Sequence, residues 1–161
     1  RHRAPGGDPL THALAIEPVS GRIFVSSGNG VEIYDPRDGR WSDFSNLRVG
    51  DLAFGPDGRL WAVRWTGSEV RGSLPEATSD IVSFPMSGRL AGRAELEYRL
   101  PGLVDSIAFG RAGTPLAGLL LASSNTAQRP VDARGLAAPH TAAVWGIELA
   151  TRRSLQLAQG G

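Results

Sequence analysis

The stretch DLAFGPDGRLW, residues 51–61, decides the fold, because it reads as a short apolar strand, a tight turn and a second strand. Asp57-Gly58 supplies the turn, since glycine adopts backbone conformations that other residues avoid. The same order of strand and turn recurs at residues 14–26 and at residues 107–122. The chain is therefore predicted to contain three copies of one structural unit.

Each unit continues into two more predicted strands. Turn-forming sequences separate them, such as DPRDG at residues 35–39 and MSG at residues 86–88. The unit thus has four antiparallel strands, and it recurs after 38 and then after 55 residues. In order, the predicted strands are 14–18, 22–26, 31–34 and 40–44; 52–56, 59–64, 81–84 and 94–100; and 107–111, 116–122, 144–149 and 154–157.

Four short strands per unit, repeated at this spacing, indicate an all-β fold of the β-propeller type. The inner strands carry small apolar residues at successive positions, among them Ala53, Ala62 and Ala108. Such strands suit sheets that neighbouring blades bury on both faces. A β-sandwich of about twelve strands is the alternative fold, and it would explain the strands without explaining the repeat.

Residues 51–61 resemble the first strand, turn and second strand of NHL-type and gluconolactonase-type six-bladed propellers. GRIFVSSGNGVEIYD, residues 21–35, resembles seven-bladed families whose repeat carries a Tyr-Val-Thr-Asn-like strand. The resemblance extends over residues 11–157 and implies the fold class. No Trp-Asp dipeptide closes a blade and no paired glycines of the kelch type occur, which disfavours those two families.

The repeat divides the chain into an N-terminal extension (residues 1–10) and three blades (residues 11–48, 49–102 and 103–161). Propellers close with four to eight blades, so three blades form a partial ring. The remaining blades must come from the same longer chain or from a second copy, and the sequence favours the first of these.

Composition excludes several functional classes. The formal net charge is +1, and all 17 basic residues are arginines scattered mostly beside turns, which argues against nucleic-acid binding. The longest apolar stretch, residues 116–122, is too short to span a bilayer, and residues 1–10 lack the apolar core of a signal peptide. No cysteine is available for disulfide or thiolate chemistry. A periplasmic or extracellular location is slightly favoured over a cytoplasmic one.

In a propeller, the segments that lead into the innermost strands and the loops that join the second and third strands of each blade emerge on one face. Two of these loops, residues 66–80 and 123–143, are long, and long loops tend to be functional. We therefore expect a protein, peptide or carbohydrate ligand to bind on this face. The candidate residues there are His12, Asp51, Trp65, Asp105 and His140.

The sequence contains no complete catalytic constellation, so a non-catalytic binding or scaffolding module without a cofactor is expected. The alternative is an enzyme of the lactonase or sugar-dehydrogenase type with a divalent cation, such as Ca²⁺, in the axial channel. The resemblance to gluconolactonases implies Asp105 as a metal ligand, because those enzymes hold their metal with Asn or Asp just before an inner strand. His12 is the second metal candidate, since imidazole also binds divalent cations.

Overall fold

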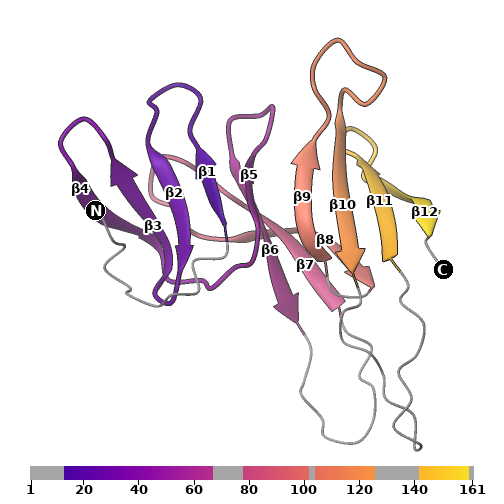
Figure 1. Cartoon of the computed structure of the whole chain (residues 1–161), viewed down its shortest axis with the longest axis horizontal. Helices are drawn as coiled ribbons and strands as arrows, with labels where there is room; N and C mark the ends of the chain where they lie inside the picture. The colour runs from indigo at the N-terminus through magenta and orange to yellow at the C-terminus, as the bar shows by residue number, and fades with distance from the viewer. Residues whose placement is uncertain (1–12, 67–77, 102–103, 126–141, 160–161) are drawn as a thin grey trace, which may run out of the picture.

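The computed structural model describes residues 13–66, 78–101, 104–125 and 142–159 (Figure 1). All the regular secondary structure within these residues consists of β-strands. The same residues contain no helix that is long and apolar enough to cross a membrane. The predicted all-β fold is therefore confirmed.

The twelve strands form three separate four-stranded antiparallel sheets, and each sheet consists of strands that are consecutive in the sequence. The first contains β1 (Leu14–Ile16), β2 (Ile23–Ser27), β3 (Gly30–Asp35) and β4 (Arg40–Ser45). The second contains β5 (Leu52–Phe54), β6 (Leu60–Thr66), β7 (Thr78–Phe84) and β8 (Glu95–Pro101). The third contains β9 (Val104–Phe109), β10 (Leu119–Asn125), β11 (Ala142–Glu148) and β12 (Arg153–Gln159).

Local turn chemistry produces the hairpins. Gly58, between β5 and β6, has a φ of +75°, which a residue with a Cβ rarely adopts. Its neighbour Asp57 accepts a hydrogen bond from the Arg59 amide at 3.1 Å and another from the Trp61 indole nitrogen at 3.2 Å. The turn that the sequence predicts here is thus fixed by a side chain as well as by glycine.

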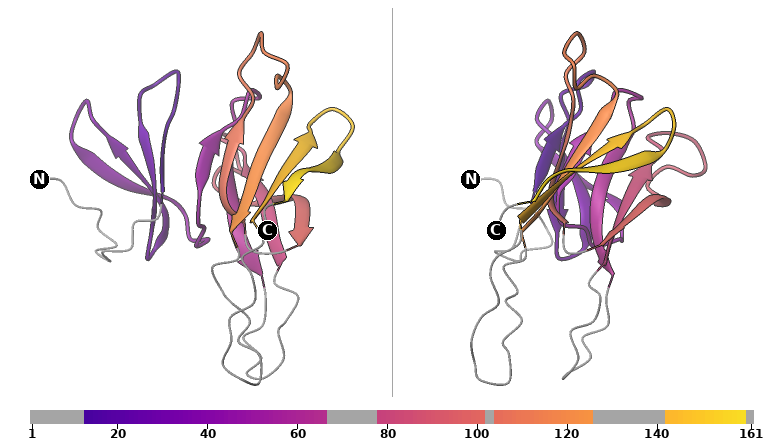
Figure 2. Two further views of the ribbon diagram at one scale, coloured as in Figure 1. Left: turned by 45° about the vertical axis from the view of Figure 1, so that its right-hand side comes forward. Right: turned by 90° about the vertical axis from the view of Figure 1, so that its right-hand side faces the viewer.

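The three sheets stack face to face as successive blades (Figure 2). One apolar cluster fills the space between the first and second blades, and a second cluster fills the space between the second and third. Phe24 of the first blade meets Phe54 of the second edge to face, with ring centroids 5.3 Å apart. Trp61 meets Phe109 of the third blade in the same way at 5.5 Å.

The middle blade is buried on both faces, as the sequence predicts. Four successive residues of β6 are buried, although alternate side chains of a strand point to opposite faces. Leu60 and Ala62 belong to the first cluster, and Trp61 and Val63 belong to the second.

The predicted starts of β9 and β10 are among the strand boundaries that the structure corrects. β9 begins at Val104, three residues before the predicted start, because the register with β10 continues to Ser124 through an irregularity. β10 begins at Leu119, three residues after the predicted start, because Leu116 lies in a turn. The Leu116 carbonyl closes this turn by accepting a hydrogen bond from the Leu119 amide at 3.1 Å. Gly118 in this turn has a φ of +81°.

Each blade also contains a β-bulge between its third and fourth strands. The register shifts between Val31 and Glu32 in the first blade, between Ile81 and Val82 in the second, and between Val144 and Trp145 in the third. These positions are equivalent when the strand pairings of the three sheets are aligned.

Candidate functional site

The loop face is defined here as the side that carries the segments leading into β1, β5 and β9 and the connections β2–β3, β6–β7 and β10–β11. It is the lower side of the molecule in Figure 1. β6 and β10 are longer than predicted and run to Thr66 and Asn125, so the two long connections comprise residues 67–77 and 126–141. Both connections lie outside the described residues.

Asp51 lies on this face directly before β5, as the sequence predicts, and its carboxylate joins two blades. Oδ2 accepts a hydrogen bond from the Ile107 amide at 2.7 Å and from the Ser106 hydroxyl at 2.8 Å, both in β9 of the third blade. The Asp51 carbonyl accepts a further hydrogen bond from the Val63 amide at 3.1 Å. The geometry assigns Asp51 a structural contact between blades.

Asp80 was expected in a loop but is the third residue of β7, where its side chain is 7% exposed. The Arg99 guanidinium of β8 donates two hydrogen bonds to its carboxylate, at 2.7 and 3.2 Å. Hydrogen bonding to Asp80 raises the pKa of Arg99 above its ordinary value. The second carboxylate of this region is therefore engaged within its own blade.

The structure describes the other four predicted site residues to different extents. Asp105 is the second residue of β9 and is exposed, so it lies within the strand and not in the segment before it. Trp65 is in β6, and the structure describes its backbone but not its side chain. His12 and His140 lie outside the described residues.

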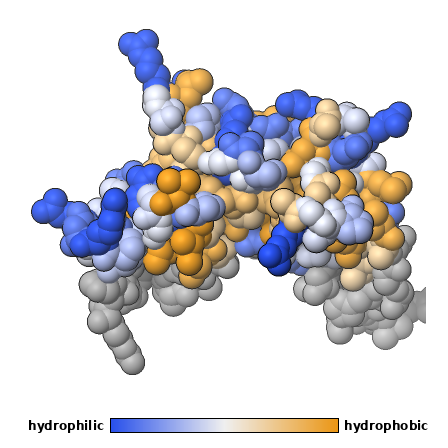
Figure 3. All heavy atoms as spheres, turned by 90° about the horizontal axis from the view of Figure 1, so that it is seen from above, coloured by the Kyte–Doolittle hydropathy of each residue, from blue (hydrophilic) through white to orange (hydrophobic). Residues whose placement is uncertain are grey.

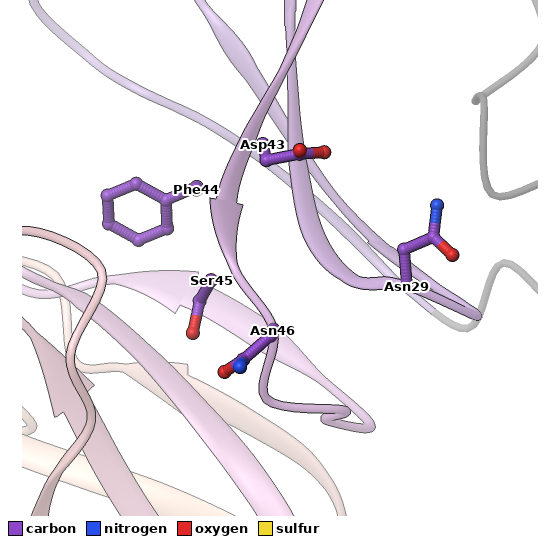
Figure 4. Close-up of a pocket in the computed structure, with 5 residues that line it drawn as sticks. All are labelled: Asn29, Asp43, Phe44, Ser45 and Asn46. Carbon is purple, nitrogen blue, oxygen red and sulfur yellow. The ribbon is translucent and has the colours of Figure 1, made fainter.

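A polar hollow of about 230 Å³ opens on the loop face of the first blade, beside the β2–β3 turn and the end of β4 (Figure 4). It is lined by Asn29, Asp43, Phe44, Ser45 and Asn46. Figure 4 shows Asn29 and Asp43 on one side of the β4 ribbon, while Phe44, Ser45 and Asn46 project to the other side. The exposed amide and carboxylate groups offer both hydrogen-bond donors and acceptors.

Glycine at position 30 shapes this hollow. Gly30 has a φ of +122°, and a Cβ at this position would overlap the main chain of Ser45 and Asn46. The Arg48 side chain also donates a hydrogen bond to the Gly28 carbonyl at 2.8 Å. The end of β4 therefore lies directly against the β2–β3 turn.

The sequence did not predict the residues of the hollow. Asn29-Gly30 carries an ordinary turn signal, and Asp43 and Asn46 read as polar residues near a strand end. The one available signal was the Gly30 position, since an isolated glycine beside a strand can mark a close backbone approach.

The described residues do not assemble a site for a divalent cation. No group of three or more His, Asp or Glu side chains that could hold a metal ion occurs among them. Asp51, which lies on the same face as Asp105, already accepts two hydrogen bonds from β9.

No protein-family model and no curated protein sequence matches this chain. Among solved structures, the chain is similar to the soluble aldose sugar dehydrogenase of Escherichia coli in its apo form, with a TM-score of 0.55 and 16% sequence identity. The match covers 87% of this chain and 44% of that protein, so this chain spans less than half of its length. At this identity the likeness shows the propeller-type fold alone.

Proposed function

We propose that this chain is part of a non-catalytic propeller that binds a small polyhydroxy ligand, such as one aldose unit, in the polar hollow of the loop face. The observation that carries the proposal is the pair of exposed polar residues Asn29 and Asp43, which lie on one side of β4 at a hollow that Asn46 also lines. Amide and carboxylate groups suit hydroxyl-rich ligands because they can donate to and accept from neighbouring hydroxyl groups. An aldose is chosen because the similar structure is named as an aldose dehydrogenase.

The size of the hollow limits the ligand. Pockets for drug-sized ligands measure about 300–1,000 Å³, and this one measures about 230 Å³. It therefore suits a single sugar unit or the end of a longer glycan. The carboxylates of Asp51 and Asp80 are engaged in structural contacts, which supports binding over catalysis for the part of the face that they occupy.

Saturation-transfer NMR with D-glucose and D-galactose, followed by calorimetry, tests the proposal. Binding should be lost in the double variant Asn29→Ala/Asp43→Ala and kept in Asp38→Ala, which changes an exposed turn residue of the same blade. Equal binding by both variants, or no binding by the unmodified chain, would contradict the proposal.

A second candidate is a sugar dehydrogenase or lactonase, which the fold likeness favours. Asp105 and His12 would then contribute to a divalent cation site in the axial channel. Calorimetric titration with Ca²⁺, Mn²⁺ and Zn²⁺ separates the two candidates. The binding proposal expects nothing tighter than about millimolar, the weak end of the range for extracellular calcium modules, whereas a micromolar site that Asp105→Ala removes would favour the enzyme.

A further inference from the structure

The two end faces of the three-blade arc repeat the surfaces that hold the blades together. We call the face of a blade toward the preceding blade its N-face and the face toward the following blade its C-face. Inside the arc, the C-face of the first blade meets the N-face of the second, and the C-face of the second meets the N-face of the third. Among the described residues, the N-face of the first blade and the C-face of the third therefore have no neighbouring blade.

The N-faces differ in exposure along the innermost strands, whereas Val25 and Glu32, which lie beside Leu14 on the N-face of the first blade, are 7% and 1% exposed. Leu14, Leu52 and Ile107 occupy one position in the three sheets, as their pairing with the second strands shows. Leu52 and Ile107, which a preceding blade covers, are each 5% exposed, whereas Leu14 is 60% exposed. The next N-face residue of β1, Ile16, is 58% exposed.

The C-faces show the same contrast at the other end. Val31, Ile81 and Val144 occupy one position at the bulge of each sheet. Val31 and Ile81 are fully buried, and Val144 is 37% exposed. Leu155 and Leu157 of β12 are 67% and 48% exposed on the same sheet.

This C-face also contains an apolar groove. Leu119, Leu155 and Leu157 line a space of about 530 Å³ around Gly146, and Glu148, Arg153 and Ser154 complete its wall. Hydrophobic side chains reach the surface at this end of the molecule, on the right in Figure 3. Gly146 has no side chain, so the groove beside it has room for an apolar side chain from an N-face. Phe54 and Phe109 occupy one N-face position inside the arc, and Ile16 occupies the same position on the first blade.

We infer that the N-face of the first blade binds the C-face of the third blade in a second copy of this chain. Two copies would meet through two identical interfaces and close a ring of six blades, within the four to eight that propellers contain. The second copy is the chosen occupant because one chain carries both halves of an interface that the arc already forms twice. Additional blades on a longer polypeptide, which the sequence favoured, are an outcome of the test.

Light scattering on the purified 161-residue chain tests the inference. The expected mass is twice the 17.0 kDa of one chain and should not grow with concentration. Ile16→Glu on the N-face and Leu155→Glu on the C-face should each halve the mass, because a carboxylate would be buried without a partner. Leu90→Glu is the matched control, since Leu90 is 47% exposed in the β7–β8 turn, away from both end faces. Far-UV circular dichroism verifies that the variants fold.

Mixing the two monomeric variants sharpens the test. In a mixed pair, one interface combines both changes and the other combines two unmodified faces, so the mixture should recover dimers that neither variant forms alone. An unmodified chain that stays monomeric, or that grows into open polymers, would overturn the inference. So would variants that remain dimeric, or a mixture that stays monomeric.

Discussion

Removing the Asp51 carboxylate should weaken the contact between the second and third blades. In Asp51→Ala, the Ile107 amide loses the acceptor that lies 2.7 Å away, and Ile107 is only 5% exposed, so water cannot readily replace it. A buried donor left without a partner costs about 1–3 kcal/mol. The Ser106 hydroxyl is exposed and can turn to water, so its lost hydrogen bond adds little. We expect the free energy of unfolding to fall by about 2–3 kcal/mol.

Urea denaturation followed by tryptophan fluorescence measures this loss, at one fixed protein concentration. For an m-value of about 2 kcal/mol/M, the midpoint should fall by about 1 M or slightly more. Asp51→Asn keeps one acceptor oxygen and should lose about half as much. Asp38→Ala removes an exposed turn carboxylate and should change stability by no more than about 0.5 kcal/mol. If Asp51→Ala and Asp38→Ala share one midpoint, the contact between blades contributes nothing and the reasoning is wrong.

Gly92→Ala should lower the urea midpoint of unfolding more than Gly88→Ala does. Both glycines have positive φ, which costs alanine about 1–2 kcal/mol, but only at position 92 would a Cβ overlap the main chain of β4 in the neighbouring blade. Arg99→Ala leaves the buried Asp80 carboxylate of β7 without its cation and should lower the urea midpoint clearly below that of Asp38→Ala. Equal midpoints for these two variants would contradict this. The Arg37 side-chain hydrogen bond lowers the pKa of Asp35 from 3.8 to about 2. Its stabilising effect is therefore present above pH 3.8 and lost as the pH falls toward 2. NMR titration should give a midpoint near 2 that returns toward 3.8 in Arg37→Ala, and an unchanged midpoint would refute the assignment.

The repeat could be predicted from the sequence because its determinants are local. Turns such as Asp57-Gly58 depend on residues within a few positions, and apolar strands on either side of them need no information from distant segments. The starts of β9 and β10 were missed because pairing between strands, not composition, sets where a strand begins.

The candidate site could be predicted only in part. The sequence located the loop face and Asp51, but the hydrogen bond from Ile107 to Asp51 joins residues 56 positions apart and has no local signal. The polar hollow depends on the close approach of Gly30 to the end of β4, which exists only once the first sheet has formed. Sequence reasoning therefore favoured the long loops and overlooked a short turn.

The repeated β-bulge bears on how such arcs can associate. Each bulge places one extra residue in the last strand of its blade: Phe44 in β4, Glu97 in β8 and Leu157 in β12. These three strands form the outer rim, where unpaired amides and carbonyls could add strands from another molecule. A bulge interrupts the even spacing of those groups and increases the local twist, so a straight strand cannot pair along the whole rim. The rim thus resists growth into fibrils, and it leaves the flat faces of the blades as the surfaces through which copies of the arc can join.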